Sequence, residues 1–246
     1  MTWSVVNVVN WMDAADRSRG HDGRVSEPLL PQPLVPASPE RGDRAGHDVM
    51  SGPMQRSVYI IGSIVALMWA VELVDVLFGH RLDRFGVRPH RLDGLDGIVT
   101  APFLHSSWAH LIGNTVPFAA MGWVVLAGGV RRFVAVSLLV MVGSGAGIWL
   151  FGQSGQVHIG ASGMVFGYLG YLLLRGVFER RLGQLAVGVL VGVIYGGLLR
   201  GVLPTNSAVS WQGHLFGFAA GVGAAWLLAR GADRSGSTAG AGEVTS

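Results

Sequence analysis

The sequence of 246 residues contains no cysteine, no lysine and few charged residues of any kind. The absence of cysteine excludes disulfides, thiolate catalysis and zinc sites built on cysteine. Charged residues make up 13% of the chain, whereas a soluble domain carries about a quarter. This scarcity indicates that most of the chain lies in lipid. All 18 basic residues are arginine and the formal net charge is only +3, so nucleic acid is not an expected partner.

Apolar residues and glycine are abundant instead. Half of the residues are hydrophobic and 38 are glycine, a residue that lets membrane helices pack closely. Residues 1–56 hold five prolines between Pro28 and Pro39, and this block predicts a disordered tail. Residues 231–246 are rich in glycine, serine and alanine and predict a flexible end. The membrane domain is therefore expected over residues 57–230.

Charge-free stretches predict an all-α membrane protein with six transmembrane helices. A helix needs ~20 mostly apolar residues to cross a bilayer. Residues 133–174 contain no charge and are too long for one helix, so the polar break at 152–156 divides them into two. Pro204-Thr205-Asn206 marks a turn near the start of the last stretch. The expected spans lie at 58–78, at 111–127, in the two parts of 133–174, at 182–199 and within 201–229.

Arginine placement predicts the orientation of these helices, because cytoplasmic loops carry an excess of basic residues. Ten arginines are expected on one side of the membrane: Arg41, Arg44, Arg56, Arg131, Arg132, Arg175, Arg180, Arg181, Arg230 and Arg234. The other side receives Arg81, Arg84, Arg88, Arg91 and Arg200. Both termini are thus expected in the cytoplasm. The second, fourth and sixth spans then run inward from the outer face, with polar residues in their first turns at similar depth.

Those polar residues have the types that acyl transfer requires. Ser162 begins the fourth span and His214 lies near the start of the sixth. A serine hydroxyl becomes a nucleophile when a histidine accepts its proton. His110 and Asn114 share one face of the second span, and with the backbone N–H groups at Ser162 they can stabilise an oxyanion.

Glycines flank this pattern. Gly160 and Gly163 allow close backbone approach and a special turn beside Ser162. Gly213, Gly217 and Gly221 recur every four residues in the sixth span. Small-residue faces of this kind allow two helices to pack closely, which would deliver the histidine toward the serine.

Other interpretations of the same residues remain open at this point. The Gly-x-Ser-Gly string and His214 are also typical of helix packing. His105, His110 and His158 could suggest a metal site, yet none falls in a His-Glu-x-x-His pattern, and no metal or cofactor is expected. Glu72 and Asp75 share a face of the first span, where they suit a transporter's ion path or simply tie the helix to its neighbours.

Over residues 58–229 the chain resembles the rhomboid family of intramembrane serine proteases. The resemblance rests on three groups of residues: His105, His110 and Asn114; Gly160-Ala161-Ser162-Gly163; and His214-Leu215-Phe216-Gly217 followed by Gly221. The first loop of that family often carries a Trp-Arg pair, whereas residues 79–102 contain no tryptophan.

The resemblance implies a six-helix rhomboid-like bundle in which Ser162 is the nucleophile and His214 its base. It implies an oxyanion hole made by His110, Asn114 and the Ser162 N–H, with Phe166 against the catalytic histidine and His105 in a supporting role. Expected partners are transmembrane protein substrates, cleaved near the outer face of a bacterial plasma membrane, and the lipid bilayer. A non-proteolytic relative that binds membrane clients and a small transporter are the alternatives.

Overall fold

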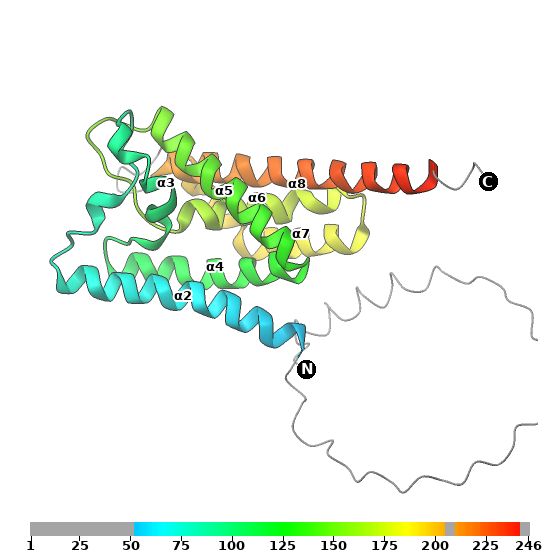
Figure 1. The fold of residues 1–246 in the computed structure, drawn as a ribbon, viewed down its shortest axis with the longest axis horizontal. Helices are drawn as coiled ribbons and strands as arrows, with labels where there is room; N and C mark the ends of the chain where they lie inside the picture. Colours follow the sequence, from blue (N-terminus) through cyan, green and yellow to red (C-terminus); the bar gives the residue numbers. More distant parts are fainter. Residues whose placement is uncertain (1–51, 205–209, 242–246) are drawn as a thin grey trace, which may run out of the picture. The chain divides into compact units, whose positions relative to one another are not determined.

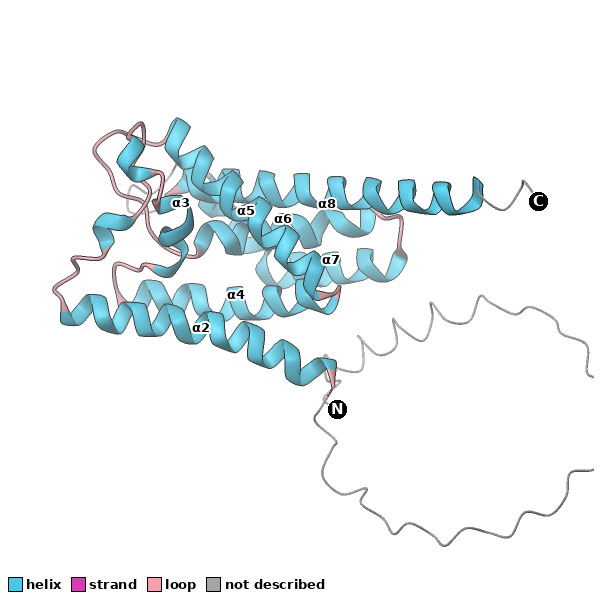
Figure 2. Ribbon diagram, in the orientation of Figure 1, coloured by secondary structure: helices cyan, strands magenta, loops and turns pink. Residues whose placement is uncertain are grey.

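The structure is a computed structural model that describes residues 52–204 and 210–241. Figure 2 shows that these residues form helices and loops without any strand. The long helices are α2 (Pro53–Leu77), α4 (Trp108–Ala127), α5 (Val130–Phe151), α6 (Ser162–Phe178), α7 (Leu182–Tyr195) and α8 (Trp211–Ala241). The prediction of an all-α membrane protein with a six-helix rhomboid-like bundle is confirmed.

Length and apolar composition mark four helical stretches as able to cross a membrane. These are Met54–Leu77, Trp108–Ala127, Val130–Phe151 and Leu182–Val202. Helix α6 is apolar but has only 17 residues. This length is at the lower end of the range of about 17–25 residues that can cross a bilayer.

Two predicted boundaries differ from the structure. The fifth span was expected at 182–199, but α7 ends at Tyr195 and residues 196–202 form the 3-10 helix η5 (Gly196–Val202). The sixth span, expected within 201–229, is α8 from Trp211. The Gly196-Gly197 pair, Gly201 and the following Pro204 disfavour a continuing α-helix here. Helix α8 also continues to Ala241, into the segment expected to be flexible. The predicted tail at 1–56 lies outside the described residues apart from the start of α2.

Helix α6 is the central element of the bundle. It packs against α4, α5, α7 and α8, and Figure 1 shows it among them. Tyr168, Leu169, Tyr171 and Leu172 are almost completely buried, as expected for a helix enclosed by others. The N-terminal ends of α4, α6 and α8 lie at the same end of the bundle (Figure 1).

Glycines bring α6 and α8 into backbone contact. A methyl group added at Gly217 would collide with the carbonyl oxygen of Gly163, and one added at Gly221 would collide with that of Gly167. At Gly170 the added carbon would lie 2.5 Å from the Phe218 carbonyl oxygen. The small-residue faces predicted from the sequence therefore do pack closely, and they set the separation of the two helices that carry Ser162 and His214.

The loop between α2 and α4 folds over the N-terminal end of α6. It contains the short helix α3 (Gly97–Thr100) and three 3-10 turns: η2 (Asp83–Phe85), η3 (Leu92–Gly94) and η4 (Ala101–Phe103). Val87 and His158 exchange two backbone hydrogen bonds of 2.9 Å. The Gly160 N–H donates to the Ala101 carbonyl at 2.9 Å. These bonds hold the segment that precedes Ser162.

Candidate active site

The structure brings Ser162 and His214 into direct contact. Ser162 is the first residue of α6 and His214 lies in the first turn of α8. The distance from Ser162 Oγ to His214 Nε2 is 2.8 Å. His214 is only 6% exposed, whereas Ser162 is partly exposed. The hydroxyl is therefore accessible while the imidazole that contacts it is enclosed.

The second ring nitrogen of His214 determines which nitrogen carries the proton. His214 Nδ1 lies 2.9 Å from the backbone carbonyl oxygen of Gly201. A carbonyl oxygen only accepts hydrogen bonds, so Nδ1 must donate. In the neutral ring Nε2 then has a free lone pair directed at the serine hydroxyl. This tautomer is the one in which the imidazole can accept a proton from Ser162.

Stacking fixes the orientation of the same ring. The Phe166 and His214 rings have centroids 4.1 Å apart and planes inclined by 9°. A carbon added at Gly201 would lie 2.9 Å from both His214 Nδ1 and Phe166 Cζ. Glycine at this position thus lets the carbonyl approach the imidazole, and Phe166 closes its other face.

His110 and Asn114 lie beside the turn before the serine. Gly160 has φ +114°, a conformation favourable only for glycine. A carbon added there would lie 2.6 Å from His110 Cε1 and 3.6 Å from Asn114 Nδ2. The Asn114 amide donates to the His110 carbonyl at 3.1 Å. Both side chains therefore line the approach to Ser162 from α4.

His105 contacts the backbone that leads into α6. Its Nε2 accepts from the Ala161 N–H at 3.4 Å, and its ring lies edge-on to His110 with centroids 5.1 Å apart. The side chain is fully buried. Burial, together with the smaller effect of the neighbouring His110, lowers the pKa of His105 to about 4. The ring is consequently neutral at physiological pH.

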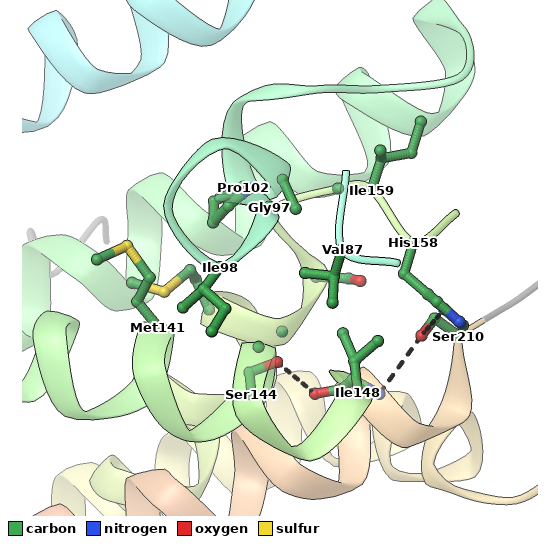
Figure 3. A pocket seen from close by; sticks show the side chains of 17 residues that line it. Val87, Gly97, Ile98, Pro102, Met141, Ser144, Ile148, His158, Ile159 and Ser210 are labelled. Carbon is green, nitrogen blue, oxygen red and sulfur yellow. Dashed lines mark hydrogen bonds between the residues drawn. The ribbon is translucent and has the colours of Figure 1, made fainter. Parts of the chain in front are cut away.

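Ser162 forms part of the wall of a small pocket, which Figure 3 shows from close by. Its volume is about 30 Å³, and Ser162, Gly163, Ser144, His158 and Ser210 contribute to its wall. Figure 3 shows Val87 and Ile98 of the α2–α4 loop closing one side and Ile148 of α5 another. Its lining mixes apolar side chains with a few hydroxyls.

Sequence reasoning missed Ser144, Ser210 and Gly201 in this region and considered His158 only as a possible metal ligand. Ser144 Oγ donates to the Gly213 carbonyl at 2.9 Å, and His158 Nδ1 lies 2.7 Å from Ser210 Oγ. Gly201 supplies the carbonyl that anchors His214. The run of small residues at 143–147 was a signal for the first of these. The Gly201 carbonyl left no such signal, because any residue carries a backbone carbonyl.

The predicted site residues therefore gather around one point. Each of them contacts or belongs to one of three parts of the structure: Ser162, its helix α6, or the turn before it. These residues are His105, His110, Asn114, Gly160, Gly163, Phe166, His214 and Gly217. Glu72 and Asp75 are not among them and lie in α2.

The chain is similar to one protein family and to several mycobacterial proteins. The model of the Rhomboid domain family matches residues 93–231. Uncharacterized proteins of Mycobacterium tuberculosis and Mycobacterium bovis are each 43% identical to the chain over 174 residues, which is 68% of this chain and 72% of the relative. An uncharacterized protein of Mycobacterium leprae is 41% identical over 174 residues, 68% of this chain and 69% of the relative. The matched region contains every site residue from His105 to Gly217, and the chain belongs to the rhomboid family of integral membrane proteins.

Proposed function

We propose that this protein is an intramembrane serine endopeptidase that cleaves transmembrane protein substrates near the outer face of the membrane. The observation that carries the proposal is the 2.8 Å contact between Ser162 Oγ and His214 Nε2. The Gly201 carbonyl and the Phe166 ring hold the imidazole in the tautomer and orientation of a base. A serine and a base in such contact form the minimal unit of nucleophilic catalysis.

In the proposed reaction Ser162 Oγ attacks the carbonyl carbon of the scissile peptide bond and its proton passes to His214 Nε2. The tetrahedral intermediate collapses when His214 returns this proton to the leaving amine. An acyl-enzyme on Ser162 remains. Water, deprotonated by His214, then attacks the ester, releases the new carboxyl terminus and regenerates the serine hydroxyl.

The oxyanion formed in each step would be stabilised by donors around Gly160. Backbone N–H groups in the first turn of a helix have no intrahelical acceptor, so the Ser162 N–H is available. His110 and Asn114 approach the same turn from α4. Each donor of this kind contributes a factor on the order of 10²–10³ in soluble serine proteases.

Substrate preference follows from the size of the neighbouring pocket. The pocket is small, with a volume of about 30 Å³. We expect a small residue before the scissile bond, which suits such a pocket and is what the resemblance to rhomboid proteases implies. A substrate helix must also unwind locally, because its own hydrogen bonds shield the peptide carbonyls.

Placement at the outer face rests on the arginine distribution. The residues Arg131, Arg132, Arg175, Arg180 and Arg181 adjoin the ends of α4 and α6 remote from Ser162. Reporter fusions after Arg132 and Arg181 should report the cytoplasm, and fusions near Gly155 and Thr205 the outside. The opposite pattern would move the site to the inner face.

Covalent labelling tests the nucleophile. The purified full chain should react with a fluorophosphonate or an isocoumarin and should cleave a single-span reporter substrate. Ser162→Ala should abolish both activities, and His214→Ala should reduce both steeply because the pair acts as a unit. Ser154→Ala is the matched serine control, since Ser154 is exposed in the same interhelical segment and bonds to His90.

The outcomes separate the alternatives. Labelling and cleavage that survive in Ser162→Ala would exclude this serine as the nucleophile. A folded wild-type protein that binds transmembrane helices but neither labels nor cleaves would favour the non-proteolytic relative. Loss of labelling in Ser154→Ala would show that the assay reports general disruption of the segment rather than the nucleophile.

A further inference from the structure

A second group of titratable side chains lies at the end of α2, outside the site described above. Asp75 belongs to the last turns of α2, and His80 and Asp83 follow in the loop. One potential ligand atom from each of these three residues lies within 4.8 Å of the others. Asp75 is buried, Asp83 half-buried and His80 exposed. The proposed proteolysis uses none of them.

Glu72 adds a fully buried carboxylate to this group. Its exposed fraction is 0%, and neither Oε1 nor Oε2 has a hydrogen-bond partner among the described residues. It lies one turn before Asp75 on the same helix face, close enough to interact electrostatically with Asp75 and His80. A buried carboxylate without a partner is costly, so its environment requires either a proton or a cation.

The chain reverses sharply to assemble these residues. Gly79 and His80 both have left-handed backbone conformations, with φ of 68° and 58°. The His80 N–H donates to the Asp75 carbonyl at 2.8 Å, and the Leu82 N–H donates to Asp75 Oδ1 at 2.6 Å. This turn places His80 Nδ1 3.4 Å from Asp75 Oδ2 and 4.0 Å from Asp83 Oδ2.

Few positively charged side chains of the protein compensate the negative charge of the carboxylates of Glu72, Asp75 and Asp83. Among the described residues, the ion pairs of Asp75 and Asp83 are with His80, and Glu72 has none. The adjacent Arg84 instead places its guanidinium over the Phe85 ring, 4.8 Å from the centroid. Three carboxylates thus face one imidazole, and a buried charge is stable only when it is paired or coordinates a metal.

We propose that Asp75, His80 and Asp83, supported by the neighbouring carboxylate of Glu72, bind a divalent cation of the Zn²⁺ or Mn²⁺ class. One imidazole nitrogen with carboxylate oxygens is a donor set suited to these ions. Ligands ~2.1 Å from a common ion lie roughly 3.4 Å apart in a tetrahedron. The present separations of 3.4 and 4.0 Å require only a small contraction around an ion. The exposed imidazole provides the path from solvent.

The bound cation would join the end of α2 to the loop that leads toward the pocket. Asp83 begins η2, and Val87 two residues beyond its end pairs with His158 and lines the pocket whose wall includes Ser162. The expected consequence is greater stability of the folded chain in the presence of the ion, because a ligand that binds only the native state stabilises it. This proposal is independent of the proteolytic activity.

Metal content and thermal unfolding test the site directly. The full-length protein in detergent would be stripped with EDTA, dialysed against ZnCl2, MnCl2 or CaCl2, and analysed for bound metal and Tm. We expect one Zn²⁺ or Mn²⁺ per chain and a higher Tm with either ion. Glu72→Gln and His80→Asn should each weaken binding by about 10-fold or more, by analogy with losses of supporting groups in metal sites.

The histidine variant keeps the test interpretable if Glu72→Gln fails to fold. Asparagine tolerates the left-handed conformation, and residue 80 is exposed. His90→Asn is the matched control, because His90 also has a left-handed backbone (φ 62°) and bonds to Ser154 instead of to acidic residues. His90→Asn should bind the metal as the wild type does.

Several results would overturn the assignment. Wild-type protein that binds neither ion, or His80→Asn that binds as tightly as wild type, would exclude the proposed ligand set. Equal weakening in His90→Asn would show a nonspecific loop effect. Zinc that remains in both cluster variants but is lost in His214→Ala would place the ion at the proposed catalytic histidine instead.

Discussion

The two polar regions of the bundle differ in how their buried groups are satisfied. At the junction of α6 and α8, both nitrogens of His214 have partners, and Ser144 bonds to the Gly213 carbonyl. At the end of α2, both oxygens of Glu72 lack a hydrogen-bond partner. Among the described residues, protein atoms therefore satisfy the imidazole of His214 fully, whereas they leave the carboxylate of Glu72 without any hydrogen bond.

The difference has a structural cause. Helices α6 and α8 meet through glycine backbones, so the positions of Ser162 and His214 are set by main-chain contacts that have little freedom. The end of α2 is joined to its loop by a short turn, and only 22% of the most apolar part of this helix is buried by the rest of the protein. A preorganised pair suits chemistry, whereas an incompletely satisfied cluster suits a ligand that completes it.

The largest expected effect comes from breaking the glycine contact. Gly217→Val should reduce cleavage and serine labelling below detection, because its side chain would force α8 away from the Gly163 carbonyl. A displacement of about 1 Å can already cost about 10²-fold in rate. Cleavage rate and labelling of the purified protein would be measured together with helix content by circular dichroism.

Gly223→Val in the same helix is the control for this prediction. An added carbon at Gly223 has no neighbour within 4 Å, so this variant should retain activity. Activity in a folded Gly217→Val protein would show that the close approach of α6 and α8 is not what positions the pair.

Removing a proposed oxyanion donor should have the next largest effect. His110→Ala and Asn114→Ala should each lower kcat by about 10²–10³ without loss of folding. The reason is that both side chains line the turn at Gly160 rather than hold the bundle together. Steady-state cleavage of the reporter substrate would measure the loss. Wild-type rates in both variants would remove the α4 side chains from the mechanism.

The buried neutral His105 should make stability depend on pH. Its pKa is lowered from 6.5 to about 4 in the folded chain, so between these values the unfolded chain binds a proton that the folded chain does not. The contribution of the buried neutral His105 to the free energy of unfolding is fully present above about pH 6.5 and is lost as the pH falls toward 4. The loss amounts to roughly 3 kcal/mol, at about 1.4 kcal/mol per pKa unit.

Comparison with His105→Gln isolates this contribution, because other titrating groups remain in both proteins. The amide of glutamine can still accept from the Ala161 N–H, which His105 contacts now. Tm measured from pH 7.5 to 4.5 should fall less steeply in the variant than in the wild type. Parallel curves would mean that His105 is not held neutral by its surroundings.

The smallest effect is expected outside both polar regions. Deletion of residues 2–50 should leave the cleavage rate within about two-fold of the full chain, since a segment of that composition cannot bury a core of its own. Rates would be normalised to the amount of membrane-inserted protein. Complete loss of cleavage in an inserted protein would assign the N-terminal segment to the active machinery.

The helices of the bundle could be predicted because each depends on a local property. A charge-free apolar stretch of sufficient length forms a membrane helix wherever it occurs, and the starts of α4, α5 and α7 lie within three residues of the expected spans. The end of the fifth span was wrong by four residues, because α7 ends at Tyr195 rather than at 199. Residues 196–202 are as apolar as the helix before them, so apolar length alone does not distinguish η5 from a continuing α-helix.

The sequence by itself determined the residue types of both polar regions: a serine, three histidines and an asparagine for one, and three acids and a histidine for the other. Only the tertiary structure decided which of them meet. Ser162 and His214 are 52 positions apart, and Ser144 and Gly213 are 69 apart. Such contacts depend on the separation and rotation of packed helices. That geometry arises from many side chains and glycines acting together, so no local pattern contains it.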